Sequence, residues 1–364
     1  MKKLRIIFAL SILQLALFTA GCGSREQTVP KTLSENSQYW WTDQSSVQNG
    51  TDGYYLIKTV DRRIYYCDKE SRQIVPLCNK AECSHEEGEE DCNAAFTGYT
   101  VLPLMLRQHG DKLYLIGSDM ENNVSILQIA LDGSGWDVLN VLWRKESEND
   151  GGVTVFLTDN GYGYYKWHQI SEDGETEVWG ISRVALQKDA KPEELFRGEN
   201  VNYLSMSIYD GYLYYIKRSY DEKAVPIQMC RYSFDAREEE VLIPEGTMGS
   251  YGFLDQIMYY TDENPGVWKM DLKTGEKELF LDGEEGILPL ERVFCDGESV
   301  CVLNTRQVRA EGGDKGLCRI YNTEGKLTGS VEIGVDEYMV VYGGDEDCLV
   351  IQGMLDEKFY WKKD

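Results

Sequence analysis

One short pattern, a tight turn followed by an aromatic strand, recurs along this sequence and constrains the fold most. Each copy opens with Asp-Gly, Asn-Gly or a similar pair and continues into a run rich in Tyr, Val and Ile. The turns of successive copies are marked by Gly53, Asp111, Gly161, Gly211, Gln256, Gly297 and Glu346. The steps between these markers are 58, 50, 50, 45, 41 and 49 residues. A period in the forties with short strands is typical of β-propeller blades.

A third strand follows each of these hairpins, and most of the third strands end in Asp or Asn with turn residues after them. The predicted third strands span residues 64–68, 127–132, 180–184, 230–235, 268–272, 318–322 and 358–362. From Gln38 onward no window has convincing amphipathic helical periodicity, so the predicted class is all-β.

These repeats predict a β-propeller over residues 38–364, with seven four-stranded blades; six or eight blades stay open as alternatives. A lone blade has two apolar faces, and radial packing buries each face on a neighbour. The last repeat stops at Asp364 after its third strand. The segment before Tyr39 is predicted to supply the missing strand, so that pairing of the N- and C-terminal strands closes the ring. The alternative is a pair of open β-sandwich domains.

The motifs Tyr-Trp-Trp-Thr-Asp at 39–43 and Met-Tyr-Tyr-Thr-Asp at 258–262 resemble the Tyr-Trp-Thr-Asp repeats of low-density-lipoprotein-receptor-type propellers. The run Ile-Ala-Leu-Asp-Gly at 129–133 is similar to a third strand of those blades. Bacterial surface lipoproteins with such propellers form a familiar class. Receptor propellers have six blades, whereas seven are predicted here. Their flanking growth-factor-like modules are not recognised in this sequence. The resemblance therefore implies the fold and not the ligands.

The first residues have the pattern of a secretory signal, predicted to be residues 1–21. Lys2, Lys3 and Arg5 precede an apolar run over 6–18, which is shorter than the roughly 20 residues of a membrane span. The ending Ala20-Gly21-Cys22 resembles a bacterial lipobox, although Thr19 replaces the usual Leu. The resemblance implies a lipid on the Cys22 sulfur and anchoring at the extracytoplasmic face of a bacterial cell membrane. An ordinary cleaved signal or a transmembrane anchor is the alternative.

Residues 22–37 are the predicted lipidated cysteine and a polar tether. The chain has a net charge of -25, and the only basic cluster of note is in the predicted signal. Phosphate binding needs clustered Lys and Arg, so nucleic acid is excluded as an expected partner. A hydrophobic content of 42% is enough for a packed core.

An insert over residues 76–96 breaks the repeat, within the longest step. It holds Cys78, Cys83, His85 and Cys92 in the spacing Cys-x4-Cys-x-His-x6-Cys. Three thiols and an imidazole are a sufficient set for a structural Zn²⁺ site. Export favours disulfides instead, either within the insert or to Cys67, so both chemistries stay open. No other cofactor is expected.

The remaining cysteines are scattered through the repeats. Cys230 and Cys318 take the same place in their blades, which indicates small core residues. Cys295 and Cys301 flank one hairpin turn and are candidates for pairing.

No catalytic motif is recognised in the sequence. The chain has three His, and His109 and His168 are interpreted as surface or packing residues. The favoured function is a lipid-anchored binding or scaffold module for an envelope protein or glycan. The alternative is a surface hydrolase or lyase acting on polysaccharide or peptide, with carboxylates at the mouth of the propeller channel. Whether the protein is an enzyme stays open, with a non-enzymatic role favoured.

Overall fold

The chain divides into two compact units, Met1–Leu33 and Ser34–Asp364, and every residue described below belongs to the second unit. The computed structural model describes residues 47–50, 52–58, 62–86, 91–96, 98–144, 151–171, 176–221, 227–283, 286–304, 315–334, 340–344, 348–352 and 357–361. A helix long and apolar enough to cross a membrane is not found in these ranges.

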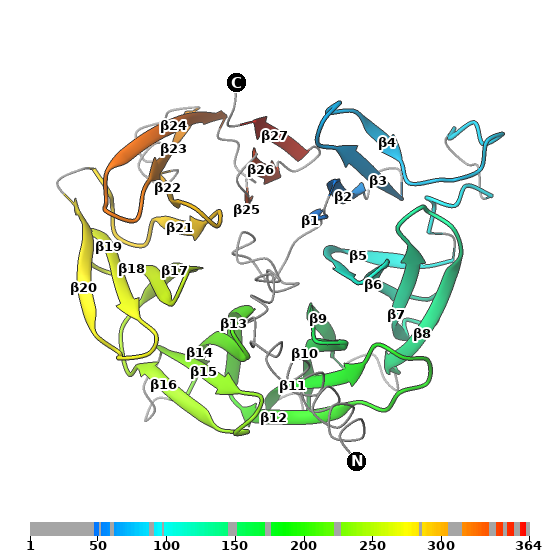
Figure 1. The fold of residues 1–364 in the computed structure, drawn as a ribbon. Coiled ribbons are helices and arrows are strands. Elements are labelled where there is room, and N and C mark those ends of the chain that lie inside the picture. The colour runs from blue at the N-terminus through cyan, green and yellow to red at the C-terminus, as the bar shows by residue number, and fades with distance from the viewer. Residues whose placement is uncertain are drawn as a thin grey trace, which may run out of the picture. The chain divides into compact units, whose positions relative to one another are not determined.

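The described residues form seven antiparallel sheets, and within each sheet the strands are paired in sequence order (Figure 1). We call these sheets blades 1 to 7. Blades 1 and 2 contain β1 (Val47–Asn49), β2 (Gly53–Lys58), β3 (Arg63–Asp68), β4 (Ile74–Pro76), β5 (Thr100–His109), β6 (Lys112–Ser118), β7 (Val124–Ala130) and β8 (Trp136–Trp143). Blades 3 and 4 contain β9 (Gly152–Asp159), β10 (Tyr162–Ile170), β11 (Glu177–Ala185), β12 (Glu193–Glu199), β13 (Val201–Tyr209), β14 (Tyr212–Ser219), β15 (Ile227–Ser233) and β16 (Glu239–Ile243).

The last three blades continue the same order. They contain β17 (Met248–Leu254), β18 (Ile257–Asp262), β19 (Gly266–Asp271), β20 (Lys277–Asp282), β21 (Arg292–Cys295), β22 (Val300–Leu303), β23 (Lys315–Tyr321), β24 (Leu327–Gly334), β25 (Val340–Gly344), β26 (Cys348–Gln352) and β27 (Glu357–Trp361). The predicted turn-plus-strand copies correspond to the second strands β2, β6, β10, β14, β18, β22 and β26, which confirms the repeat.

The prediction of seven four-stranded blades is wrong for the last sheet. Six sheets have four strands, whereas the described part of blade 7 has three, β25 to β27. A fourth strand there would have to come from another part of the chain. The segment before Tyr39, which was expected to supply it, lies outside the described residues, so closure by strand pairing stays a prediction.

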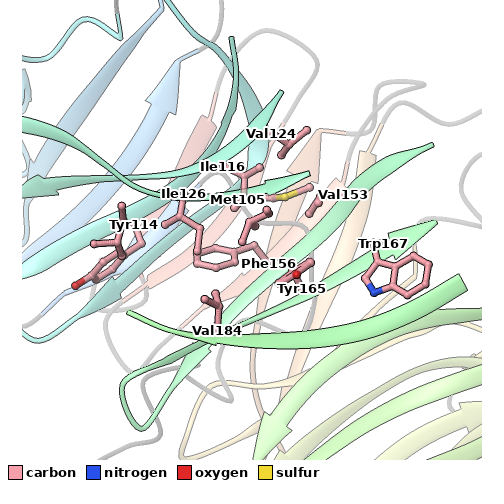
Figure 2. Packing of buried hydrophobic residues seen from close by; sticks show 12 residues of the cluster. Met105, Tyr114, Ile116, Val124, Ile126, Val153, Phe156, Tyr165, Trp167 and Val184 are labelled. Carbon is pink, nitrogen blue, oxygen red and sulfur yellow. The ribbon is translucent and has the colours of Figure 1, made fainter. Parts of the chain in front are cut away.

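Hydrophobic packing nevertheless joins each blade to the next. Seven buried clusters each combine side chains from two neighbouring blades. Between blades 2 and 3, Phe156 has no exposed surface and packs among Met105 and Ile126 (Figure 2). A Cβ on Gly163 would lie only 2.6 Å from the Phe156 ring, so glycine at 163 leaves room for that side chain.

The last of these clusters joins blade 7 to blade 1. Cys348 and Val350 of β26 pack with Val47 and Leu56, and the rings of Tyr54 and Phe359 are 5.4 Å apart. Each blade therefore has two packed neighbours, as a ring requires, and the alternative of two open sandwiches is wrong.

The turn residues have the geometry that their chemistry predicts. Asp210 and Gly211 both have positive φ, 48° and 78°, between the paired residues Tyr209 and Tyr212. This is the backbone of a two-residue hairpin turn, in which Asp-Gly is favoured. The repeated acidic residues at these turns thus have a structural role.

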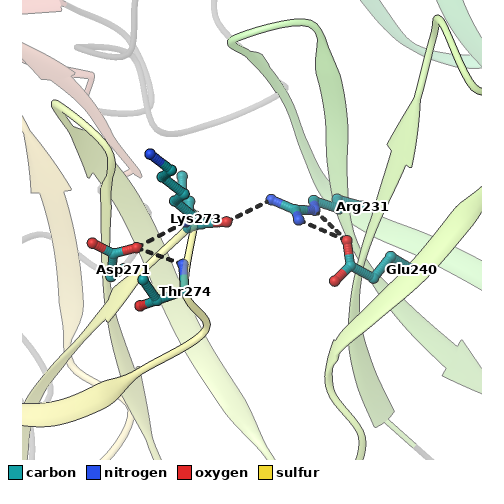
Figure 3. Close-up of polar contacts among 6 residues, drawn as sticks. Arg231, Glu240, Asp271, Lys273 and Thr274 are labelled. Carbon is teal, nitrogen blue, oxygen red and sulfur yellow. Dashed lines mark hydrogen bonds and ion pairs between the residues drawn. The ribbon is translucent and has the colours of Figure 1, made fainter.

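Polar contacts add to the packing between blades 4 and 5 (Figure 3). Arg231 of β15 forms an ion pair with Glu240 at 2.7 Å and donates a hydrogen bond to the carbonyl oxygen of Leu272 at 3.0 Å. The carboxylate of Asp271 accepts backbone hydrogen bonds from Lys273 and Thr274, at 2.9 and 2.7 Å, and so orders the turn that presents this carbonyl.

Candidate metal centre

The Cys/His-rich insert connects the outermost strand of blade 1 to the innermost strand of blade 2, and both of its ends are bonded to β3. The N–H of Leu77 donates to the carbonyl of Ile64 at 2.9 Å, and the N–H of Ile64 donates to the carbonyl of Ala94 at 2.9 Å. Leu77 and Phe96 are buried in the cluster between blades 1 and 2. The insert is therefore fixed at its base, while its middle carries the polar residues.

The structure brings together the four side chains that the spacing singled out. One ligand atom from each of Cys78, Cys83, His85 and Cys92 lies within 4.8 Å of the others. The Nδ1 of His85 is 3.6 Å from the sulfur of Cys92. Cys92 is 3% exposed, and the other three are partly buried.

His85 has a positive φ of 58°, which is uncommon for a residue other than glycine. Such a conformation costs free energy and persists where the surroundings impose it, often at a functional site. Here it accompanies an imidazole whose Nδ1 approaches the sulfur of Cys92.

Hydrogen bonds bring the two arms of the insert together around the cluster. The side-chain amide of Asn93 donates to the side-chain oxygen of Asn79 at 2.7 Å. The ammonium group of Lys80 donates to the carbonyl oxygen of Asp91. The N–H of Cys83 donates to the carbonyl of Lys80 at 3.3 Å, which closes a tight turn between the first two cysteines.

The Cys78 thiol differs electrostatically from the cysteines of the blades. Burial raises its pKa, but hydrogen bonds from the N–H groups of Lys80 and Asn93 and from neighbouring thiols outweigh burial, so the net pKa is below the usual 9.0. By contrast, burial raises the pKa of Cys67 to about 11 and that of Cys230 to about 12. Thiolate, the form that binds metals, is thus favoured at Cys78 and disfavoured at Cys67 and Cys230.

A disulfide between Cys67 and the insert, one of the alternatives left open by the sequence, is not found in the structure. Cys67 and Ile64 lie an odd number of residues apart on β3 and therefore face opposite sides of the sheet. Ile64 faces blade 2 and packs with the insert residue Leu77, whereas Cys67 is buried against blade 7. No disulfide joins any two of the nine cysteines in the described part of the chain.

Pairing of Cys295 with Cys301 is wrong for the same reason. Cys295 is directly opposite Val300 in the β21–β22 ladder, so Cys301 points to the other face. Cys295 packs against blade 5, whereas Cys301 packs toward blade 7.

Cys230 and Cys318 are fully buried, which confirms them as core residues. Cys230 faces the preceding blade and Cys318 the following one, so their positions are not equivalent. Cys22, the predicted lipidation site, lies outside the described residues.

The other two histidines are apart from this cluster. The ring of His168 stacks on Trp179 with centroids 4.7 Å apart, and burial lowers its pKa. His109 ends β5, with its ring 6.4 Å from that of Tyr114. Interpreting His168 as a packing residue is confirmed by its stacked position.

A pocket of about 400 Å³ lies beside the cluster of Cys78, Cys83, His85 and Cys92, between the insert and blade 2. We call it the insert pocket; its lining includes Lys80, Asp91, Asn93, Tyr99, Trp136 and Asp137. The indole N–H of Trp136 donates to the carbonyl of Asn93 at 2.7 Å, which ties the insert to β8. The pocket thus combines aromatic and charged side chains from two segments.

Sequence reasoning missed this pocket, because its lining residues come from two segments that are separated along the chain. Gly133 has a φ of 77°, and a Cβ there would overlap the carbonyl oxygen of Leu77. The Asp132-Gly133 turn that precedes Trp136 therefore rests directly on the start of the insert.

Seven antiparallel sheets that pack side by side, the last on the first, define a β-propeller. The scan against protein-family models and the search of curated proteins found no match. Among solved structures, a puromycin-hydrolysing peptidase of Mycobacterium tuberculosis is similar, with 13% identity and a TM-score of 0.52. The match covers 80% of this chain and 45% of the peptidase, so this chain spans less than half of that protein. At this identity the likeness shows the fold alone.

Two further solved structures are more distant. BamB of Moraxella catarrhalis has 12% identity and a TM-score of 0.42, over 88% of this chain and 82% of BamB. TolB of Acinetobacter baumannii has 14% identity and a TM-score of 0.43, over 80% of this chain and 64% of TolB. Neither likeness supports an inference about function.

Proposed function

We propose that this protein is a lipid-anchored β-propeller at the extracytoplasmic face of a bacterial cell membrane, and that it binds a glycan or protein ligand in the insert pocket. The observation that carries this proposal is the combination of aromatic and charged side chains around one cavity. Its volume of about 400 Å³ is within the range of small-molecule sites.

The side chains of the insert pocket suit a sugar ring or a peptide side chain. Tyr99 and Trp136 are partly buried, and aromatic faces of this kind stack on apolar ligand surfaces. Lys80 and Asp137 are exposed at the same pocket and offer a donor and an acceptor for polar groups. A few such groups around an apolar surface orient a bound ligand.

Support for the anchor comes from the sequence. The signal-like residues 1–21, the lipobox-like Ala20-Gly21-Cys22 and the polar segment 23–37 together predict a tethered domain. We also propose that the propeller is of the low-density-lipoprotein-receptor type, from the motifs at 39–43 and 258–262. In the second of these, Met258, Tyr259 and Tyr260 are buried core residues of β18.

Binding can be tested with the purified full chain against a glycan array and cell-envelope fractions. For any ligand found, Tyr99→Ala should weaken binding at least about fivefold, the effect of losing roughly 1 kcal/mol of contact. Tyr220→Ala, which truncates an exposed tyrosine of blade 4, is the matched control and should bind as the wild type does. Equal affinity of the Tyr99→Ala variant and the wild type would refute the insert pocket as the binding site.

The anchor can be tested separately by fractionating cells that produce the wild type or Cys22→Ala. The wild type should stay with the membrane and incorporate labelled fatty acid, and the variant should do neither. Hydrolysis of a bound glycan or peptide, abolished by one Asp or Glu substitution, would instead support the enzymatic alternative.

A further inference from the structure

We propose that Zn²⁺ binds Cys78, Cys83, His85 and Cys92, and that this closed site holds the insert in place as one wall of the insert pocket. Zinc binding by these four residues does not depend on whether the pocket takes the ligand proposed above.

The spacing of the four ligand atoms fits a tetrahedral zinc ion. Zn–S bonds of about 2.3 Å and Zn–N bonds of about 2.0 Å place the sulfur and nitrogen ligands roughly 3.6 Å apart. The separation of the Cys92 sulfur and the His85 Nδ1 is 3.6 Å, and all four atoms lie within 4.8 Å of one another. An ion at their centre needs only small adjustments of the side chains.

The three sulfur atoms and one nitrogen atom determine which metal ion is favoured and whether the site is structural or catalytic. Soft thiolates favour zinc over calcium or magnesium, which take oxygen ligands. Four protein ligands complete the tetrahedron and leave no open position for water or substrate, so the site is structural.

The geometry also favours zinc over a disulfide. All three thiols and the imidazole converge on one point, whereas a disulfide within the insert would leave the third thiol and His85 without a role. The cysteine outside the insert that the sequence offered as a partner, Cys67, is on the other face of blade 1.

A metal at this position would be bonded to a side chain that lines the insert pocket. Cys92 lines the pocket, next to Asp91 and Asn93. The hydrogen bond from Trp136 to Asn93 then joins this arm to blade 2. Since the described insert residues between Cys78 and Asp91 are mostly exposed, few apolar contacts hold that stretch in place without the metal.

The first test is the metal content of the full chain purified without chelators. We expect about one zinc per chain, and a cobalt-substituted sample with the absorption bands of tetrahedral thiolate coordination. His85→Ala should lower the zinc content, and His85→Cys should restore it by supplying a fourth thiolate. Cys230→Ala removes a cysteine from the core between blades 3 and 4 and should keep the zinc.

The cobalt spectrum is measured on the wild type, so it remains informative if a variant fails to fold. Metal-free protein whose insert cysteines are recovered as disulfides in peptide mapping would overturn the proposal. So would full zinc content in both Cys83→Ser and Cys92→Ser. If zinc is present but no ligand binds, the site stands and the proposed binding function fails.

Discussion

The blades and the insert both contain several cysteines and use them in opposite ways. In the blades, Cys230 and Cys295 are each fully buried among apolar side chains, and burial raises the pKa of both thiols. In the insert, three thiols converge on an imidazole, and hydrogen bonds lower the pKa of Cys78. The same residue type is therefore a small hydrophobe where burial dominates and a proposed metal ligand where polar groups surround it.

The two regions also differ in what stabilises them. The blades are held by buried area that extends around the ring, and the middle of the insert by a few polar contacts and the proposed metal. A change in the blades should therefore leave the zinc content of the insert unchanged, and a change in the insert should leave the stability of the blades largely unchanged. The following predictions test this separation of the two regions.

The largest expected effect comes from Phe156→Ala, which opens a cavity between blades 2 and 3. Truncation of a fully buried phenylalanine costs about 3–5 kcal/mol of unfolding free energy. Urea unfolding should show this loss, whereas the zinc content of the folded variant should equal that of the wild type. Met120→Ala is the control, since Met120 is 90% exposed. A loss of zinc from folded Phe156→Ala would contradict the separation.

A smaller effect is expected from Gly252→Ala. The added Cβ would lie 2.8 Å from the backbone nitrogen of Cys295, where β17 and β21 approach closely. Blades 5 and 6 would have to separate, at a cost of about 1–3 kcal/mol. Gly211 has a positive φ and lies at an exposed turn with no atom within 4 Å of a Cβ. Gly211→Ser therefore measures the loss of stability that a positive φ causes without steric overlap. Thermal unfolding of both variants provides the measurement.

Removing the proposed zinc ion should have a smaller effect on the ring than either substitution at an interface. The four ligands lie within fifteen residues, so the unfolded chain retains affinity for zinc and the stabilisation of the folded state is reduced. We expect chelation to change the unfolding temperature of the propeller little and to make the insert sensitive to protease. Unfolding of the whole propeller on chelation would show that the two regions are coupled.

The smallest expected effect is that of Asp271→Asn. Backbone hydrogen bonds from Thr274 and Lys273 lower the pKa of the Asp271 carboxyl. A lowered folded-state pKa gives stability above the ordinary pKa of 3.8, and that stability is lost as the pH falls through the folded-state value. The wild type should therefore be slightly more stable at neutral pH, and the two proteins should converge in strong acid. A difference that persists in acid would show that the hydrogen bonds of Asp271 do not depend on its charge.

The sequence predicted local features well and arrangements in space less well. The seven hairpins were predictable because Asp-Gly turns and aromatic strands are local signals, and the four candidate ligands because they fall within fifteen residues. The orientations of Cys67 and Cys301 were not predictable, since they depend on which face of a blade meets which neighbour. The insert pocket was missed because Tyr99 and Trp136 lie far apart in the sequence.

The packing of Cys348 and Val350 against Val47 and Leu56 has a consequence for the order of the chain. A ring whose first and last blades are in contact has no preferred starting point as far as packing is concerned. A circularly permuted chain that begins at β9, ends at β8 and joins the old termini by a flexible linker would keep all seven interfaces. The stability of the ring should therefore depend little on where in the ring the chain begins.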